Sequence, residues 1–143
     1  MAEPEKQSPS ASQPESADHD GGLRGVLARD QRYPLEAYLF LGDALKYTQT
    51  WLNKNPTSEV EAERHVTGQE LLQGIQRYAE LEFGLLAPTV LRAWGIRRSE
   101  DFGEMVFNLV EAGLMSKTDK DSRIDFIGGL DIDRAFRQRI DLQ

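Results

Sequence analysis

The amino-acid sequence predicts a mostly α-helical protein with one small β-hairpin. Apolar residues recur every three or four positions over several long stretches, which is the spacing of helices that bury one face. Proline and glycine stand at the ends of these stretches, where they commonly begin or end helices. Two short β-like runs, Leu114–Thr118 and Arg123–Ile127, enclose a polar turn and indicate the hairpin.

The domain organisation follows from length and charge. The chain has 143 residues, which suits one domain with an appendage. Residues 1–22 hold no large apolar side chain after Met1, and their acidic residues outnumber the one lysine. Such a segment cannot bury enough apolar surface to offset the entropy lost on ordering. We therefore expect a disordered acidic tail over 1–22 and a single compact domain over 23–143.

The first long helix is predicted over Pro34–Asn53. Pro34 suits the first turn of a helix, because its missing N–H costs nothing there. The apolar positions on the predicted buried face are Leu35, Tyr38, Leu39, Leu45 and Trp51 or Leu52. The preceding Leu23–Arg29 is too short to assign, although three apolar residues share one helical face, and Glu59–His65 is predicted to be a polar loop.

Three shorter helices are predicted after residue 66. Thr67 and Glu70 form a capping box at the start of the first, and Gly84 ends it. The second has Pro88 near its start and closes at Gly95-Ile96. The third begins with Ser99 as its cap and ends at Gly113. A last short helix is predicted around Leu130–Ile140, capped by Asp131 or Asp133.

Helices followed by a hairpin over residues 66–127 are typical of a winged-helix-like domain, a fold used both for reading DNA and for contacting proteins. A DNA-reading helix is normally basic. The helix in the corresponding place carries Glu100, Asp101, Glu104 and Glu111 and neither Lys nor Arg, and the net charge is −7. Both facts disfavour DNA. A cationic cluster beside the helix is the candidate for nucleic-acid contact: Arg92, Arg97, Arg98, Lys117 and Arg123.

The same helix holds the candidate protein-contact residues Glu104, Phe107, Asn108 and Glu111. Phe107 falls off the apolar stripe of this helix. Either it is exposed as an anchor for a partner, or the helix is buried on two sides. Asn108 stands among apolar neighbours; if it is buried, it needs hydrogen-bond partners and specifies a local geometry.

The sequence gives little support for a catalytic site or a metal site. His65 and Asp101 are the candidate pair for a small enzyme, but no serine-nucleophile motif stands beside them. The aspartates between Asp119 and Asp133 lack the spacing and glycine of a calcium loop. With no cysteine there is no thiolate site. We expect neither metal nor cofactor.

Several runs together carry a family resemblance: Tyr33–Phe40, Arg64–Leu72, Phe83–Ala87, Trp94–Ile96, Asp101–Leu114, Lys117-Thr118 and Asp131–Phe136. They are similar to a small family of conserved hypothetical proteins from planctomycetes and verrucomicrobia, over about Leu23 to Phe136. The resemblance implies no activity and carries over no catalytic residue. It marks Arg64, His65 and Asp101, with Asn108 and Lys117, as polar family features.

The leading hypothesis is a non-catalytic protein-interaction (adaptor) module of winged-helix-like type. The alternatives are a nucleic-acid-associated transcriptional regulator and a small enzyme that uses His65 and Asp101. The sequence contains no apolar run long enough to span a membrane and no apolar leader at its N-terminus. We therefore expect a cytoplasmic protein with a protein partner and no membrane partner.

Overall fold

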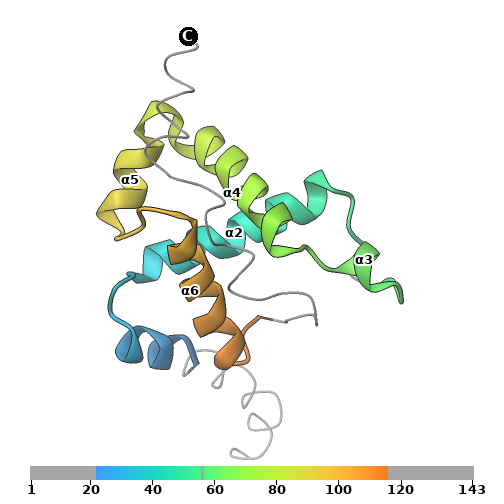
Figure 1. The fold of residues 1–143 in the computed structure, drawn as a ribbon, viewed down its shortest axis with the longest axis horizontal. Coiled ribbons are helices and arrows are strands. Elements are labelled where there is room, and N and C mark those ends of the chain that lie inside the picture. The colour runs from blue at the N-terminus through green and yellow to red at the C-terminus, as the bar shows by residue number, and fades with distance from the viewer. Residues whose placement is uncertain (1–21, 56, 116–143) are drawn as a thin grey trace, which may run out of the picture.

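A computed structural model describes residues 22–55 and 57–115, and the regular elements there are helices (Figure 1). A short helix covers 22–29. It is followed by α2 (Leu35–Trp51), α3 (Glu61–Arg64), α4 (Gly68–Phe83), the 3₁₀ turn η1 (Gly84–Leu86), α5 (Ala87–Ala93) and α6 (Ser99–Glu111). The prediction of a mostly helical protein is confirmed for this part of the chain.

The centre of the fold is the crossing of α2 and α4 (Figure 1). Gly74 of α4 lies against Thr48 of α2 so closely that a Cβ atom on Gly74 would sit 1.7 Å from the Thr48 hydroxyl oxygen. Thr48 is fully buried and donates its hydroxyl to the Ala44 carbonyl at 2.7 Å. The absence of a side chain at residue 74 therefore sets how closely the two helices approach.

An aromatic cluster fixes the other end of this crossing. The Phe40 ring stacks on Phe83 with centroids 5.7 Å apart and lies 5.6 Å from Trp94. Phe83 and Trp94 meet edge to face at 5.8 Å. Phe40 thereby joins α2 to the end of α4 and to the turn after α5.

The predicted buried face of α2 is correct at Tyr38 and wrong at Leu35 and Leu39. Leu35 and Leu39 are exposed, whereas Phe40 and Leu41 are buried. The apolar residues of this helix surround most of its circumference, so spacing alone does not choose among the faces. Packing chooses: the small residues Ala37, Ala44 and Thr48 form the side on which neighbouring helices approach.

Helix ends follow the predicted chemistry at most positions. Thr67 and Glu70 form the capping box, and Gly84 caps α4 with a φ of 56°. Gly95 has a φ of 84° and is followed by the fully buried Ile96. A Cβ atom at Gly95 would lie 2.7 Å from the Arg32 carbonyl oxygen, so this turn also packs against the segment before α2.

Two expectations are corrected. Ser99 does not cap α6: it is the first helical residue and fully buried, because the Asp101 carboxylate reaches back to the cap position instead. The segment Glu59–His65 is not entirely loop but includes α3, before which the Ser58 hydroxyl accepts the Val60 N–H at 3.0 Å. The short segment over 22–29 is a helix, and Val26 within it is buried.

The predicted acidic tail (apart from Gly22), hairpin and last helix lie outside the residues that the structure describes, apart from the first positions of the hairpin. No strand occurs within 22–55 or 57–115. A winged-helix-like arrangement is therefore not shown by the described part.

Candidate functional site

Asn108 is part of a half-buried polar network between α6 and the segment that leads into α2. Its side-chain amide donates to the Asp30 carboxylate at 2.9 Å and to the Tyr38 hydroxyl at 3.1 Å. Asn108 is half-buried, between the two cases considered from the sequence, and its amide has the hydrogen-bond partners that the buried case requires. We call Asp30, Arg32, Tyr38 and Asn108 the Asp30 network.

Asp30 is the centre of this network. It accepts from the Arg32 guanidinium through Nε at 2.8 Å and Nη2 at 2.6 Å, and from the Arg32 backbone N–H at 3.1 Å. The hydrogen bonds from Arg32, with the one from Asn108, hold the pKa of the Asp30 carboxyl well below its usual range, although burial opposes the shift. Asp30 is therefore ionised at any ordinary pH and serves as an acceptor only.

Asp101 has a similar structural task at the start of α6. One carboxylate oxygen accepts the Tyr33 hydroxyl at 2.7 Å, and the other accepts the backbone N–H groups of Arg97 and Arg98 at 2.8 and 3.2 Å. Tyr33 is buried, and this burial together with the bond to Asp101 raises the pKa of its hydroxyl. Asp101 thus joins the start of α6 to the segment before α2.

The protein-contact candidates on α6 divide into two groups. Glu104 lies 3.5 Å from the Arg32 guanidinium and Asn108 belongs to the Asp30 network, so both face the rest of the fold. Phe107 is 37% exposed and Glu111 is exposed. The outer surface of α6 therefore retains only part of the set predicted from the sequence.

The cationic candidates also divide. Arg92 in the last turn of α5 is exposed, as are Arg97 and Arg98 between α5 and α6. Lys117 and Arg123 lie outside the described residues. The structure therefore places three of the five predicted cations along one short segment and says nothing of the other two.

Arg64 and His65 lie at the end of α3. The Arg64 guanidinium donates to the Ser58 carbonyl at 2.6 Å and ties the loop before α3 to its end. Figure 1 shows α3 set apart from α6, which carries Asp101, and the oxygens of Asp101 are used by Tyr33, Arg97 and Arg98. Among the described residues, no group of three or more His, Asp or Glu side chains is placed to hold a metal ion.

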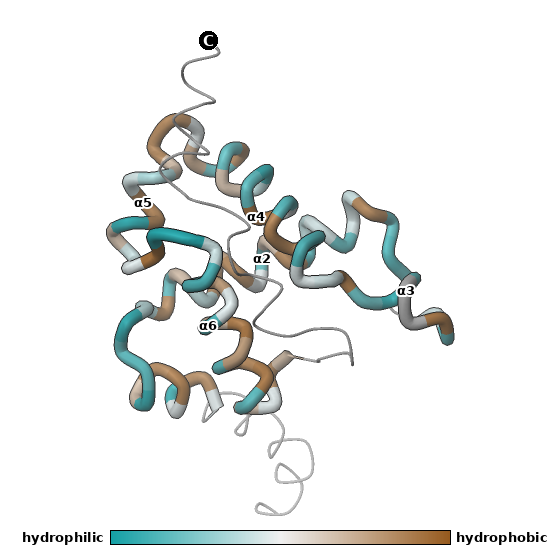
Figure 2. Tube along the Cα trace, viewed as in Figure 1, coloured by the Kyte–Doolittle hydropathy of each residue, from teal (hydrophilic) through white to brown (hydrophobic). Residues whose placement is uncertain are grey.

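The strongest surface feature was not predicted. Leu81, Leu85 and Leu86, at the turn from α4 through η1, are 68%, 60% and 64% exposed. Figure 2 shows this turn as a hydrophobic stretch at the tip of the fold. We call these three residues the leucine corner. The sequence contained a signal, since Leu81 falls off the Leu71–Ile75–Ala79 stripe and Leu85 and Leu86 follow Gly84, where the helix was predicted to end.

The leucine corner rests on a rigid base. Phe83, between Leu81 and Leu85 in the chain, packs against Phe40 and Trp94 in the aromatic cluster. Gly84, with its positive φ, turns the chain from α4 into η1. The exposed leucines therefore project from a backbone that the ring contacts of Phe83 hold against Phe40, which is buried, and Trp94, which is half-buried.

No helix among the described residues combines the length and the apolar character that crossing a membrane requires. Comparisons with protein-family models, with curated proteins and with solved structures found no match.

Proposed function

We propose that this protein is a non-catalytic interaction module that binds an apolar segment of a partner protein at the leucine corner. The observation that carries the proposal is the exposure of three leucines within six consecutive residues: Leu81 in the last turn of α4 and Leu85 and Leu86 in η1, each more than half exposed. Single exposed leucines are common on protein surfaces, whereas adjacent ones mark contact sites.

The energetic scale supports a contact of this kind. Covering the exposed parts of three leucine side chains contributes about 3 kcal/mol. Association also costs translational and rotational freedom, which this contribution alone does not offset. The corner therefore supplies the apolar centre of an interface, and polar contacts around it must supply the remaining binding free energy. The underlying aromatic cluster reduces the ordering cost, because the backbone that presents the leucines is already held in place.

The experiment compares the captured proteins of three tagged variants in native lysate. Leu81→Gln with Leu85→Gln and Leu86→Gln removes the apolar surface while keeping side-chain length and helix propensity. Val60→Gln is the control, since Val60 is 53% exposed beside α3 and away from the corner. A partner held by the wild type and by the Val60 variant, and lost from the triple variant, is expected. Recovery that is equal from all three would overturn the proposal.

A nucleic-acid-associated regulator is the second candidate, because Arg92, Arg97 and Arg98 are exposed along one segment. Under this hypothesis Arg97→Glu with Arg98→Glu abolishes capture, and nuclease treatment of the lysate does the same. Under the leading proposal both treatments leave recovery unchanged. The acidic residues of α6 itself and the net charge of −7 favour the leading proposal.

A further inference from the structure

Two exposed carboxylates stand next to the aromatic contact that joins α2 to the end of α4: Asp43 is one helical turn after Phe40, and Glu82 directly precedes Phe83. Asp43 on α2 and Glu82 on α4 are both exposed. Tyr78 on α4 reaches α2, where its ring lies 5.5 Å from that of Phe40 and 5.6 Å from that of Tyr47. Burial raises the pKa of the Tyr78 hydroxyl, and the charges of Glu82 and Asp43 add to that rise. Because Asp43 lies one helical turn from both Phe40 and Tyr47, and Glu82 lies one turn from Tyr78, the ring contacts place the two carboxylates on the same side of the contact between α2 and α4.

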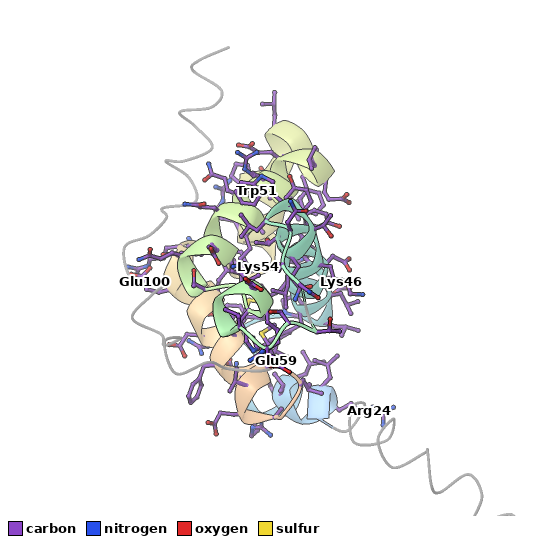
Figure 3. All side chains as sticks on the ribbon, turned by 90° about the vertical axis from the view of Figure 1, so that its right-hand side faces the viewer. Arg24, Lys46, Trp51, Lys54, Glu59 and Glu100 are labelled. Carbon is purple, nitrogen blue, oxygen red and sulfur yellow. The ribbon has the colours of Figure 1, made fainter. Side chains whose placement is uncertain are left out.

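These two negative charges are not neutralised within the described part of the chain. Neither Asp43 nor Glu82 takes part in an ion pair between residues of 22–55 or 57–115. Lys46 is exposed one turn beyond Asp43, and the Arg77 guanidinium lies 4.3 Å over the Trp51 ring (Lys46 and Trp51 are labelled in Figure 3). Glu82 directly follows Leu81 in the chain, so this negative charge borders the apolar surface.

We propose that the partner segment bound at the leucine corner is amphipathic and basic, with Lys or Arg side chains beside its apolar face that lie over Asp43 and Glu82. This inference rests on the proposed function and specifies its partner. Complementary charge at the margin of an interface selects among partners and speeds association. A second copy of this chain brings the same two carboxylates, whose repulsion disfavours self-association through this surface.

Synthetic helical peptides of about 18 residues, or five turns, test the charge preference. Three peptides share one leucine face and carry only Lys, only Glu or only Gln on the other face. Fluorescence anisotropy measures their affinity for the full chain. The Lys peptide is expected to bind about tenfold more tightly than the Glu peptide. This difference should vanish in about 1 M salt, where the screening length is about 3 Å.

Matched charge reversals locate the effect. Asp43→Lys with Glu82→Lys should abolish the preference for the Lys peptide. Glu59→Lys, in the loop before α3, with Glu111→Lys on α6 makes the same change in net charge at exposed positions elsewhere and should preserve this preference. If both pairs reduce the preference equally, the attraction is a property of net charge and the inference is wrong.

The outcomes separate this inference from the proposed function. Equal binding of all three peptides, lost in the Leu81/Leu85/Leu86 glutamine variant, would overturn the basic-partner inference and leave the interaction site intact. Binding that does not depend on the leucines would overturn both. Light scattering measures the oligomeric state of the chain without peptide. A wild-type dimer that becomes a monomer in the glutamine variant would mean that a second copy covers the corner, and would overturn the inference.

Discussion

Asp30 illustrates how one side chain joins distant parts of this fold. Its carboxylate accepts hydrogen bonds from the side chains of Arg32, two residues away, and Asn108, 78 residues away. Asn108 also reaches Tyr38, across 70 residues of chain. The sequence indicated that Asn108 needs partners if buried, since it stands among apolar residues. It did not identify them, because nothing in local spacing relates residue 108 to residues 30 and 38.

Acid should weaken the fold partly through Asp30. Its pKa is lower in the folded chain than the value of about 3.9 expected in the unfolded chain, so the carboxylate stabilises the fold above about pH 4. This contribution is lost as the pH falls from about 4 toward the folded-state pKa. Urea unfolding at about pH 7 and pH 3 should show a smaller loss of stability on acidification in Asp30→Asn than in the wild type.

The control for this experiment is Asp43→Asn, which removes an exposed carboxylate without an ion pair among the described residues. It should follow the wild type over the same pH range. A loss of stability in Asp30→Asn as large as in the wild type would contradict the role given to the Asp30 network.

The two hydrogen bonds of Asn108 should also be measurable in the free energy of unfolding. Asn108→Ala is expected to destabilise the chain by about 1–2 kcal/mol, because it removes one donor from the ionised Asp30 and one from the Tyr38 hydroxyl. Combining it with Tyr38→Phe completes a double-mutant cycle. Effects that add without coupling would show that the contact between Asn108 and Tyr38 contributes nothing.

At the scale of elements, the α2–α4 crossing depends on a position without a side chain. Gly74→Ala would place a Cβ atom inside the volume of Thr48, and the surrounding core is fully buried. We expect a loss of about 2 kcal/mol or more in the free energy of unfolding. Thr48→Ala in the same chain should recover part of the loss, since it removes the nearest atom.

Gly42→Ala is the matched control within α2. No atom lies within 4 Å of a Cβ at this position, so the substitution should stabilise the helix by about 0.5–1 kcal/mol. Chemical denaturation measures both changes. If Gly74→Ala and Gly42→Ala shift the unfolding midpoint in the same direction, the two helices do not approach as described.

Element boundaries were more predictable than element faces. The Thr67–Glu70 box and the glycines at 84 and 95 act through local chemistry, and the sequence located all three. The buried face of α2 depends on which neighbour packs against it. Its apolar residues permit several choices, so Leu35 and Leu39 were wrongly expected to be buried. The Asp101 carboxylate, and not Ser99, accepts the backbone N–H at the start of α6, and it also accepts the hydrogen bond of the buried Tyr33 hydroxyl.

At the scale of the whole molecule, the leucine corner should not contribute to folding. The three side chains are mostly exposed in the folded chain, so their replacement by glutamine should change the free energy of unfolding by no more than about 0.5 kcal/mol. Thermal and urea unfolding of the triple variant measure this. A large destabilisation would mean that the corner is buried against the remainder of the chain, and the proposed binding site would not exist.

The candidate site was the least predictable feature. The sequence directed attention to Phe107 and its neighbours because α6 resembles a contact helix in composition. The structure turns Glu104 and Asn108 toward the fold and exposes the leucines of α4 and η1 instead. A stripe pattern shows which residues can be buried together. It does not show where the packed surface of a helix ends. At the end of α4 this limit depends on the turn at Gly84, after which η1 leads into α5.

The contact between Gly74 and Thr48 has a consequence for sequence evolution. A chain that keeps this helix crossing must keep glycine at the position of Gly74, or pair a larger residue there with a smaller one at the position of Thr48. The two positions, 26 residues apart in the chain, are therefore expected to change together among descendants of this protein. Gly84 differs, because its φ of 56° favours glycine although nothing lies within 4 Å of a Cβ atom there, so it should be kept without a matching change elsewhere.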